Sequence, residues 1–404
     1  MSELRFFAAS DEALYLGPPA SQQRGESHHG RSLFPPPPTT FQGMVRTHLL
    51  LHGLTRPVGL DPAAIAAAIG GPERLPPAWE LEGPWVAGVI LHDRVERLWP
   101  WVPTPLAAEP SHREGRLRWC DVAPLGDVVT DRDALPALVL RRGDKAPPGW
   151  IPAEALWALL SGGPGASLPE TEPPFVRSET RPGLQLDPDT RAAMTSRLYF
   201  REARRLGAVA EGDHPVLRAG FAASLRAPDG AGLRDDALTR GVAHLGRRKR
   251  PLALQPQPRP VDAWERVVRG DHLTGASADR LTGDARRVWL LLASPATFDP
   301  SGRDGTPARP VLPPTPPVRF EIEAAALGEP VVLGGLDMTS GRPKPNRAFL
   351  PAGSAWVLRV SGGTAEERRA ALRALHHRCT IGSPDERSFG CGRTWVTLPF
   401  EATP

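Results

Sequence analysis

The chain is poor in the residue types on which several protein classes depend. It has only three cysteines, Cys120, Cys379 and Cys391, and no CxxC pair, so a disulfide framework is excluded and a ribbon-type zinc site is not expected. No run approaches the roughly 18 apolar residues of a membrane-spanning helix. The N-terminal segment lacks a basic region followed by an apolar core and a small-residue cleavage site, so we expect a cytoplasmic protein.

Lysine and asparagine are also scarce. The three lysines, Lys145, Lys249 and Lys344, leave 46 arginines among the 49 basic residues, and Asn346 is the only asparagine. Codon usage explains much of this skew, so the arginine content alone is weak evidence for a nucleic-acid partner. The formal net charge of +4 permits a polyanionic partner without requiring one.

The length of the chain predicts more than one domain. With 404 residues, it exceeds one ordinary hydrophobic core and suggests two domains. Proline (48) and glycine (40) together make about a fifth of the chain. This share lies below the roughly 25–30% that is typical of disordered low-complexity sequence, so we expect a folded protein with long ordered loops.

The segment FPPPPTTFQGMVRTHLL predicts a helix with a binding end. Extended prolines at 35–38 precede apolar residues at three- and four-residue spacing, and Thr39 or Thr40 is the expected N-cap. The N–H groups and dipole of a helix N-terminus stabilise a phosphate near Thr39, Thr40 and Gly43, and Arg46 adds charge. In the alternative interpretation the threonines only cap the helix, Gly43 permits close packing on a sheet, and Arg46 reaches solvent.

The C-terminal eighty residues have the clearest pattern. A strand at 355–360 is followed by a helix whose first residues, Thr364 and Glu367, form a capping-box pattern. A glycine-rich loop at 380–392 then leads to a closing strand at 393–400. This order is the second half of a βαββαβ ferredoxin-like unit.

The glycine-rich loop is a second candidate site. Its glycines allow a ligand backbone to approach closely, and its peptide N–H groups can form an anion-binding concavity. Two arginines add charge, and an aromatic ring could stack on a base. The residues concerned are Gly382, Arg387, Phe389, Gly390, Gly392 and Arg393. The alternative, in which Phe389 packs inward and the glycines only form a tight turn, stays open on local residues alone.

Catalytic and metal-binding interpretations have less support. The pairs His28-His29 and His376-His377 could act as general acid and base in RNA cleavage, but neighbouring histidines do not face one another on a helix or strand. His376, Cys379 and Cys391 are zinc-ligand types without a fourth ligand. Paired carboxylates, phosphate loops and nucleophile turns are missing from the sequence. We therefore expect no catalytic site, no metal and no cofactor.

Several segments together resemble the RAMP superfamily of CRISPR RNA-binding proteins. They are FPPPPTTFQGMVRTHLL at 34–50 and SFGCGRTWV at 388–396. Segments 179–206 and 343–360, with GGLD at 334–337, look like those of the third subunit of the type III-B Cmr effector complex. An Arg-Asp pair of the family's first strand is absent from SDEALYLGPP at 10–19, and HLGRRKR at 244–250 replaces a Gly-Gly-Glu-like turn.

The resemblance implies an α+β protein of two packed ferredoxin-like (RRM-like) βαββαβ domains with long proline- and glycine-rich insertions, at residues 1–150 and 176–404. It implies a non-catalytic subunit for antiviral defence that holds the 5′ tag of the crRNA. Its partners would be the large polymerase-like subunit, a neighbouring RAMP backbone subunit and, indirectly, target RNA. A crRNA-processing endoribonuclease and an architectural guide-coating backbone subunit are the alternatives. The residues expected to bind RNA are Thr39, Thr40, Gly43, Arg46, Arg347, Arg387, Phe389, Gly390, Gly392 and Arg393.

Overall fold

The chain folds into two compact units that alternate along the sequence. The computed structural model describes residues 1–17, 29–59, 61–71, 74–111, 116–124, 138–141, 149–163, 167–186, 189–210, 214–246, 249–274, 285–297, 312, 315–337 and 342–398. Unit 1 comprises residues 1–98, 174–259 and 332–347, and unit 2 comprises residues 99–173, 260–331 and 348–404. The sequence predicted two consecutive domains instead, at 1–150 and 176–404, because composition does not reveal that the chain returns to a unit after leaving it.

Unit 1 is built on an antiparallel sheet with the strand order β4-β13-β1-β15-β14. These strands are β1 (Ser2–Ala9), β4 (Glu80–His92), β13 (Val216–Ala227), β14 (Val242–Leu245) and β15 (Arg250–Pro256). The central strand β1 is enclosed, since Phe6 and Phe7 are fully buried although they point to opposite faces. β5 (Val95–Pro103) continues from β4 and ends in unit 2.

One face of this sheet is covered by α1 (Pro38–His48), which continues into a π-helix at Leu49–Gly53. Phe41 of α1 stacks on Phe6 with ring centroids 6.2 Å apart, so the helix packs on the central strand. The apolar spacing predicted this buried face correctly. The following helix, α2 (Pro62–Ile69), begins at Pro62, because the Asp61 side chain accepts a hydrogen bond from the Ala64 N–H and the proline occupies the first turn.

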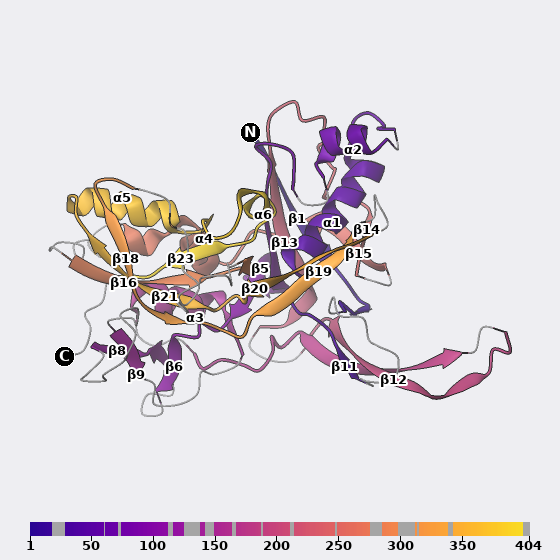
Figure 1. Ribbon diagram of the computed structural model, residues 1–404, viewed down its shortest axis with the longest axis horizontal. Helices are drawn as coiled ribbons and strands as arrows, with labels where there is room; N and C mark the ends of the chain where they lie inside the picture. The colour runs from indigo at the N-terminus through magenta and orange to yellow at the C-terminus, as the bar shows by residue number, and fades with distance from the viewer. Residues whose placement is uncertain are drawn as a thin grey trace. The chain divides into compact units, whose positions relative to one another are not determined.

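A long β-hairpin in unit 1 extends well beyond the β1–β13 sheet (Figure 1). It consists of β11 (Val176–Leu186) and β12 (Ala193–Leu206), and the short strands β2 (Ala13–Leu14) and β3 (His29–Arg31) pair with β12. Unit 1 also contains most of β19 (Val331–Asp337) and the first residues of β20 (Arg342–Leu350), which are neighbours in a small sheet.

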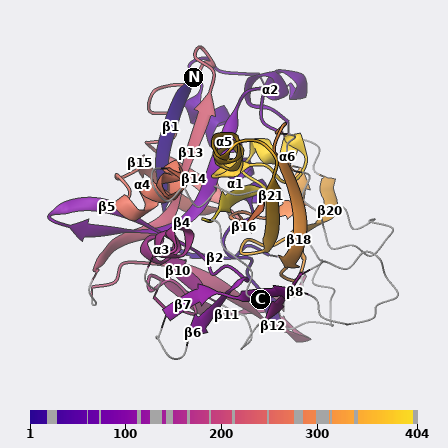
Figure 2. The same ribbon diagram turned by 90° about the vertical axis from the view of Figure 1, so that its left-hand side faces the viewer.

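Unit 2 contains a second antiparallel sheet with the order β18-β21-β16-β23-β22. The strands are β16 (Ala285–Leu292), β18 (Arg319–Ala326), β21 (Ala355–Ser361), β22 (Arg378–Cys379) and β23 (Arg393–Val396). α5 (Ala365–Leu375) lies against one face of this sheet (Figure 2). Thr364 and Glu367 form the predicted capping box at its start.

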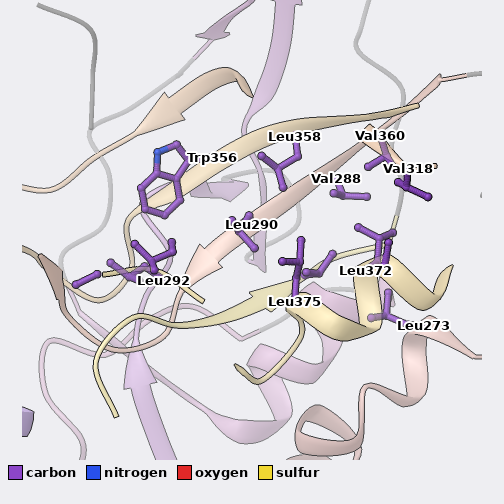
Figure 3. Close-up of a cluster of buried hydrophobic side chains, with 14 of the residues drawn as sticks. Leu273, Val288, Leu290, Leu292, Val318, Trp356, Leu358, Val360, Leu372 and Leu375 are labelled. Carbon is purple, nitrogen blue, oxygen red and sulfur yellow. The ribbon is translucent and has the colours of Figure 1, made fainter. Parts of the chain in front are cut away.

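The core of unit 2 lies between α5 and the sheet. Leu372 and Leu375 of the helix point toward Val288, Leu290 and Leu358 of the strands (Figure 3), and all are buried. Arg368 of the same helix is also buried, and it donates hydrogen bonds to the carbonyl oxygens of Gly362 and Gly363. These hydrogen bonds stabilise the turn that precedes the helix.

The remaining elements of unit 2 are short. They are β6 (Ala108–Ser111), β7 (Arg116–Trp119), β8 (Asp121–Pro124), β9 (Leu138–Arg141), β10 (Trp150–Pro152), α3 (Ala153–Ser161), α4 (Asp262–Arg269), a 3-10 turn at Asp271–Leu273, β17 (Ala296–Thr297) and α6 (Pro384–Ser388). Trp119 of β7 stacks on Trp289 of β16, 5.9 Å between ring centroids, so the second face of the sheet is also covered. Both faces of β16 are thus enclosed.

The observed architecture confirms a mixed class of helices and antiparallel sheets. In the part of the chain that the structure describes, no helix is both long and apolar enough to cross a membrane.

Candidate nucleic-acid interface

The N-terminal candidate site is the start of α1. The N-cap is Pro37 and not Thr39 or Thr40, because the proline run holds its backbone extended and Pro38 already has helical geometry. The Pro37 carbonyl oxygen accepts from the N–H groups of Thr40 and Phe41, at 2.9 and 3.0 Å. The Thr39 hydroxyl is buried without a hydrogen-bond partner among the described residues. The helix therefore begins two or three residues earlier than predicted, and both threonines lie in its first turn and not at its N-cap.

Arg46 and Gly43 occupy the same helix in different environments. Arg46 donates hydrogen bonds to the carbonyl oxygens of Ile69 and Gly70, so it caps the C-terminal end of α2. A side chain at Gly43 would meet no atom within 4 Å. The packing alternative therefore does not explain Gly43, and Arg46 already has a structural role within unit 1.

The C-terminal candidate loop contains a helix that the sequence analysis missed. Residues Pro384–Ser388 form α6, and Ser383 and Glu386 form a complete capping box at its start. The signal was present in the sequence, since Ser383 is followed by proline and, three residues on, by glutamate. The anion-binding loop predicted for this segment is thus mostly a helical turn.

Gly392 is required by the chain's own backbone. It has a φ of +70°, and a Cβ atom there would lie 1.7 Å from the Ile381 carbonyl oxygen. The Gly392 carbonyl oxygen in turn accepts from the N–H groups of Thr380 and Ile381. Gly390 has a φ of +91°, and its carbonyl oxygen accepts from the Ser294 hydroxyl at 2.6 Å. Both glycines therefore close the turn between β22 and β23 by internal contacts.

Phe389 and Arg393 are enclosed in unit 2. Phe389 is 3% exposed and Arg393 is 0% exposed. The Arg393 guanidinium donates to the His377 carbonyl oxygen at 2.6 Å. Phe389 therefore packs inward, as in the alternative interpretation of the sequence. Arg393 is enclosed because its strand, β23, has a neighbouring strand on each side. The predicted stacking of Phe389 on a base and the predicted contact of Arg393 with a phosphate would require the turn between β22 and β23 to open.

Arg347 and Arg387 are the remaining predicted residues. Arg387 is half-buried in the last turn of α6, and Arg347 is exposed on β20. Arg347 belongs to unit 1 with Thr39, Thr40, Gly43 and Arg46, whereas Arg387, Phe389, Gly390, Gly392 and Arg393 belong to unit 2. A shared site built from both ends of the chain stays a prediction.

The histidines of unit 2 have structural partners. His376 is buried, donates from Nε2 to the Val267 carbonyl oxygen at 2.6 Å and accepts at Nδ1 from the Val396 N–H at 3.1 Å. The ring of His272 lies 4.9 Å from it and is bonded to the Val396 carbonyl oxygen. Burial lowers the pKa of His272 to about 4, and burial with the neighbouring His272 lowers the pKa of His376 to about 3. Both rings are therefore neutral at physiological pH.

The other catalytic and metal-binding candidates gain no support. His28 lies outside the described residues, as does the side chain of His29. Among the described residues, no group of three or more histidines, cysteines or carboxylates is arranged to hold a metal ion. Burial raises the pKa of the Cys391 thiol, which disfavours the thiolate that zinc requires.

The structure also places four arginines on one face of the β11–β12 hairpin. Arg177 lies directly opposite Arg205, and Arg181 lies directly opposite Arg201. Residues two or four positions apart along a strand point to the same face of the sheet, and directly paired residues of neighbouring strands share that face. The four arginines therefore lie on one side of the hairpin, which we call the arginine face. No local sequence pattern indicates this face, because the arginines come together only through the register of the hairpin.

Glu179 is the one acidic side chain on the described part of the arginine face. It accepts hydrogen bonds from Arg181 at 2.7 Å and Arg205 at 2.9 Å, which hold the pKa of its carboxyl below the usual value. The Arg201 guanidinium lies 5.2 Å from the centre of the Tyr15 ring. The arginine face thus carries four positive charges and one negative charge. Like charges that lie directly opposite each other destabilise a hairpin unless an anion neutralises them.

We predict that Gly392→Ala destabilises the protein by at least about 2 kcal/mol, because the new methyl group meets the Ile381 carbonyl oxygen and the residue keeps a positive φ. Gly43→Ala is the matched control, expected to stabilise by about 0.5–1 kcal/mol since it adds a helix-favouring residue in open space. Chemical denaturation measures both. Equal stability of Gly392→Ala and wild type would contradict the assigned role.

A second prediction concerns pH. The pKa values of His272 and His376 are lowered on folding, so below about pH 6.5 the unfolded chain binds protons that the folded chain does not. The free energy of unfolding should fall from pH 6.5 to 5, approaching about 1.4 kcal/mol per pH unit for each histidine. His272→Gln should reduce this slope, and His244→Gln, at an exposed position, should not. An unchanged slope in His272→Gln would exclude the histidine pair as its source.

Comparisons with known proteins bear on the whole chain. The model of the family described as CRISPR-associated protein (Cas_Cmr3) matches residues 22–395. No curated protein matches the sequence. Two similar solved chains come from cryo-EM structures of the type III-B Cmr-beta, one bound to cognate target RNA and AMPPnP and one bound to cognate target RNA. Their TM-scores are 0.43 and 0.42 and their identities 13% and 14%, with 87% of this chain and 86% of each other chain covered. Because the family match spans nearly the entire sequence, the resemblance found in the sequence is confirmed, and the chain belongs to the Cas_Cmr3 family of CRISPR-associated proteins.

Proposed function

We propose that this chain is a non-catalytic RNA-binding subunit of a type III-B CRISPR effector ribonucleoprotein, acting in the cytoplasm in antiviral defence. Its role is to hold the 5′ tag of the crRNA beside the large polymerase-like subunit and a neighbouring RAMP backbone subunit. Membership of the Cas_Cmr3 family supports the CRISPR part of this proposal. The RNA-binding part rests on the arginine face of the β11–β12 hairpin.

The arginine face has the properties of a phosphate-binding surface. Arginine carries a planar fork of donors that matches phosphate oxygens, and its charge persists at any physiological pH. The two directly opposed arginine pairs share a single carboxylate, Glu179, so phosphates lying between them would supply the further negative charge. Tyr15, beneath the guanidinium of Arg201, adds an aromatic ring to the same surface. This combination favours a nucleic-acid strand over a purely protein partner.

We also infer that each unit is a variant of the βαββαβ ferredoxin-like fold. In unit 1 the strands β1, β4, β13 and β15 have the spatial order β4-β13-β1-β15, and in unit 2 the strands β16, β18, β21 and β23 have the order β18-β21-β16-β23. Both are the second, third, first and fourth strands in turn, each antiparallel to its neighbour. α1 follows the first strand of unit 1, and α5 follows the third strand of unit 2. Each unit thus retains one crossover helix among the described residues.

The alternative role of crRNA-processing endoribonuclease has less support. The buried histidines of unit 2 already use their ring nitrogens in internal hydrogen bonds, and burial keeps them neutral. Incubation of the purified protein with labelled crRNA should leave the RNA intact with and without divalent metal. Site-specific cleavage that a point mutation in this chain abolishes would refute the non-catalytic role.

We predict that Arg177→Glu weakens binding of a 5′-tagged crRNA about tenfold, because it replaces a phosphate-binding charge by a repelling one. The same substitution should preserve stability or raise it by about 0.2–1 kcal/mol, since the new carboxylate would lie opposite Arg205. Fluorescence anisotropy at fixed salt measures binding, and chemical denaturation measures stability.

The matched control for Arg177→Glu is Arg94→Glu. Arg94 is exposed in the turn between β4 and β5 of the same unit, so the change in net charge is identical. Arg94→Glu should bind RNA nearly as wild type does. If both variants lose affinity equally, RNA is held by diffuse charge, and the arginine face is not the site.

A further inference from the structure

A second basic surface lies on β20, where it runs beside β19 in unit 1. Residues 342–347 read Arg-Pro-Lys-Pro-Asn-Arg, and no acidic residue interrupts them. Arg342, Asn346 and Arg347 are exposed, and Lys344 is half-buried. Because side chains alternate along a strand, Arg342, Lys344 and Asn346 share one face, which we call the Lys344 face.

The residue types on the Lys344 face are unusual for this chain. The protein has 46 arginines and three lysines, so arginine serves almost every position that needs a positive charge. Lys344 is one of those three lysines, and Asn346, two residues later on the same face, is the only asparagine in 404 residues. The Lys344 face thus carries a compact ammonium and a side-chain amide, two groups that are rare in this arginine-rich chain.

The geometry of β19 fits this requirement. Gly335 is exposed on β19, and a Cβ atom there would lie 3.9 Å from Lys344 Cδ. The aliphatic stem of Lys344 therefore crosses the neighbouring strand at a glycine, with Gly334 next to it. Two consecutive glycines present bare backbone, which allows another backbone to approach closely. A flexible stem with a point charge fits such a flat surface better than the wide planar head of arginine.

These groups together match the backbone of single-stranded RNA. Side chains two residues apart on a strand are about 6.6 Å apart, so an extended nucleic-acid strand lying along β20 would meet them in succession. The ammonium of Lys344 provides three donors for a phosphate. The amide of Asn346 provides a donor and an acceptor, as does the ribose 2′-hydroxyl that distinguishes RNA from DNA.

We propose that Arg342, Lys344 and Asn346, beside Gly335, form a subsite for single-stranded RNA, in which Lys344 binds a phosphate and Asn346 binds a ribose 2′-hydroxyl. This subsite rests on the proposed RNA-binding function and assigns it a contact separate from the arginine face. It differs from a general basic patch because it requires lysine, and not only positive charge, at position 344.

The test compares Lys344→Ala and Lys344→Arg in the full chain, with single-stranded crRNA as the probe. Lys344→Ala should weaken binding roughly tenfold. It should also reduce the slope of log K against log salt by about 0.7, the loss of one phosphate contact. Lys344→Arg should recover less than half of the lost affinity on a logarithmic scale. Lys249→Ala, which removes an exposed lysine from the same unit, should bind as wild type does.

Asn346 provides an independent readout. Asn346→Ala should weaken RNA binding several-fold and leave binding of DNA of the same sequence nearly unchanged. The ratio of RNA affinity to DNA affinity should therefore fall. Thermal unfolding of each variant checks that the exposed substitutions leave the fold intact.

The outcomes separate this subsite from the function on which it rests. Failure of the wild-type chain to bind RNA would overturn the proposed function and the subsite with it. RNA binding by wild type with equal affinity in Lys344→Ala, or with full recovery in Lys344→Arg, would overturn the subsite alone. Equal losses in Lys344→Ala and Lys249→Ala would have the same meaning, because they indicate diffuse charge.

Discussion

Antiparallel strand register determines which charged side chains of this protein reach solvent. In the β11–β12 hairpin the register places Arg177 opposite Arg205 and Arg181 opposite Arg201, so the positive charges gather on one exposed face. In unit 2, β23 pairs with β16 on one side and β22 on the other, and the same residue type, Arg393, is fully enclosed. A shift of one residue in either pairing would exchange the two faces of the strand and reverse these environments.

The two units use this constraint in different ways. The sheet of unit 2 is enclosed on both faces at β16, with α5 on one side and Trp119 on the other, and its buried histidines and Arg393 fasten the closing turn. Unit 1 carries a hairpin that extends beyond its main sheet, and a segment of β20 whose residues Arg342 and 345–347 are exposed. Both surfaces that we propose for RNA binding, the arginine face and the Lys344 face, therefore belong to unit 1.

Local patterns predicted the local structure well. The Thr364–Glu367 capping box and the apolar face of α1 both depend on residues within one or two turns, and both are present. The α6 helix had an equally local signal at Ser383 and Glu386, which the glycine pattern obscured. The strand predicted at 355–360 also matches β21, which carries part of the core of unit 2.

The candidate site depends on contacts between distant residues, and its prediction was weaker for that reason. Arg46 meets carbonyl oxygens more than twenty positions away, and Arg393 meets the carbonyl of His377 through a hairpin whose register no local pattern specifies. The arginine face likewise needs residues 177–181 and 201–205 to be paired in one particular register. Among the predicted residues, only Arg347 is exposed, while Phe389 and Arg393 are enclosed.

The most direct test of the account is photocrosslinking of a 5′-tagged crRNA to the full chain, followed by identification of the crosslinked peptides. The account predicts crosslinks in peptides from the β11–β12 hairpin and from residues 342–347, both in unit 1. Crosslinks confined to other segments, with none in these two, would contradict it.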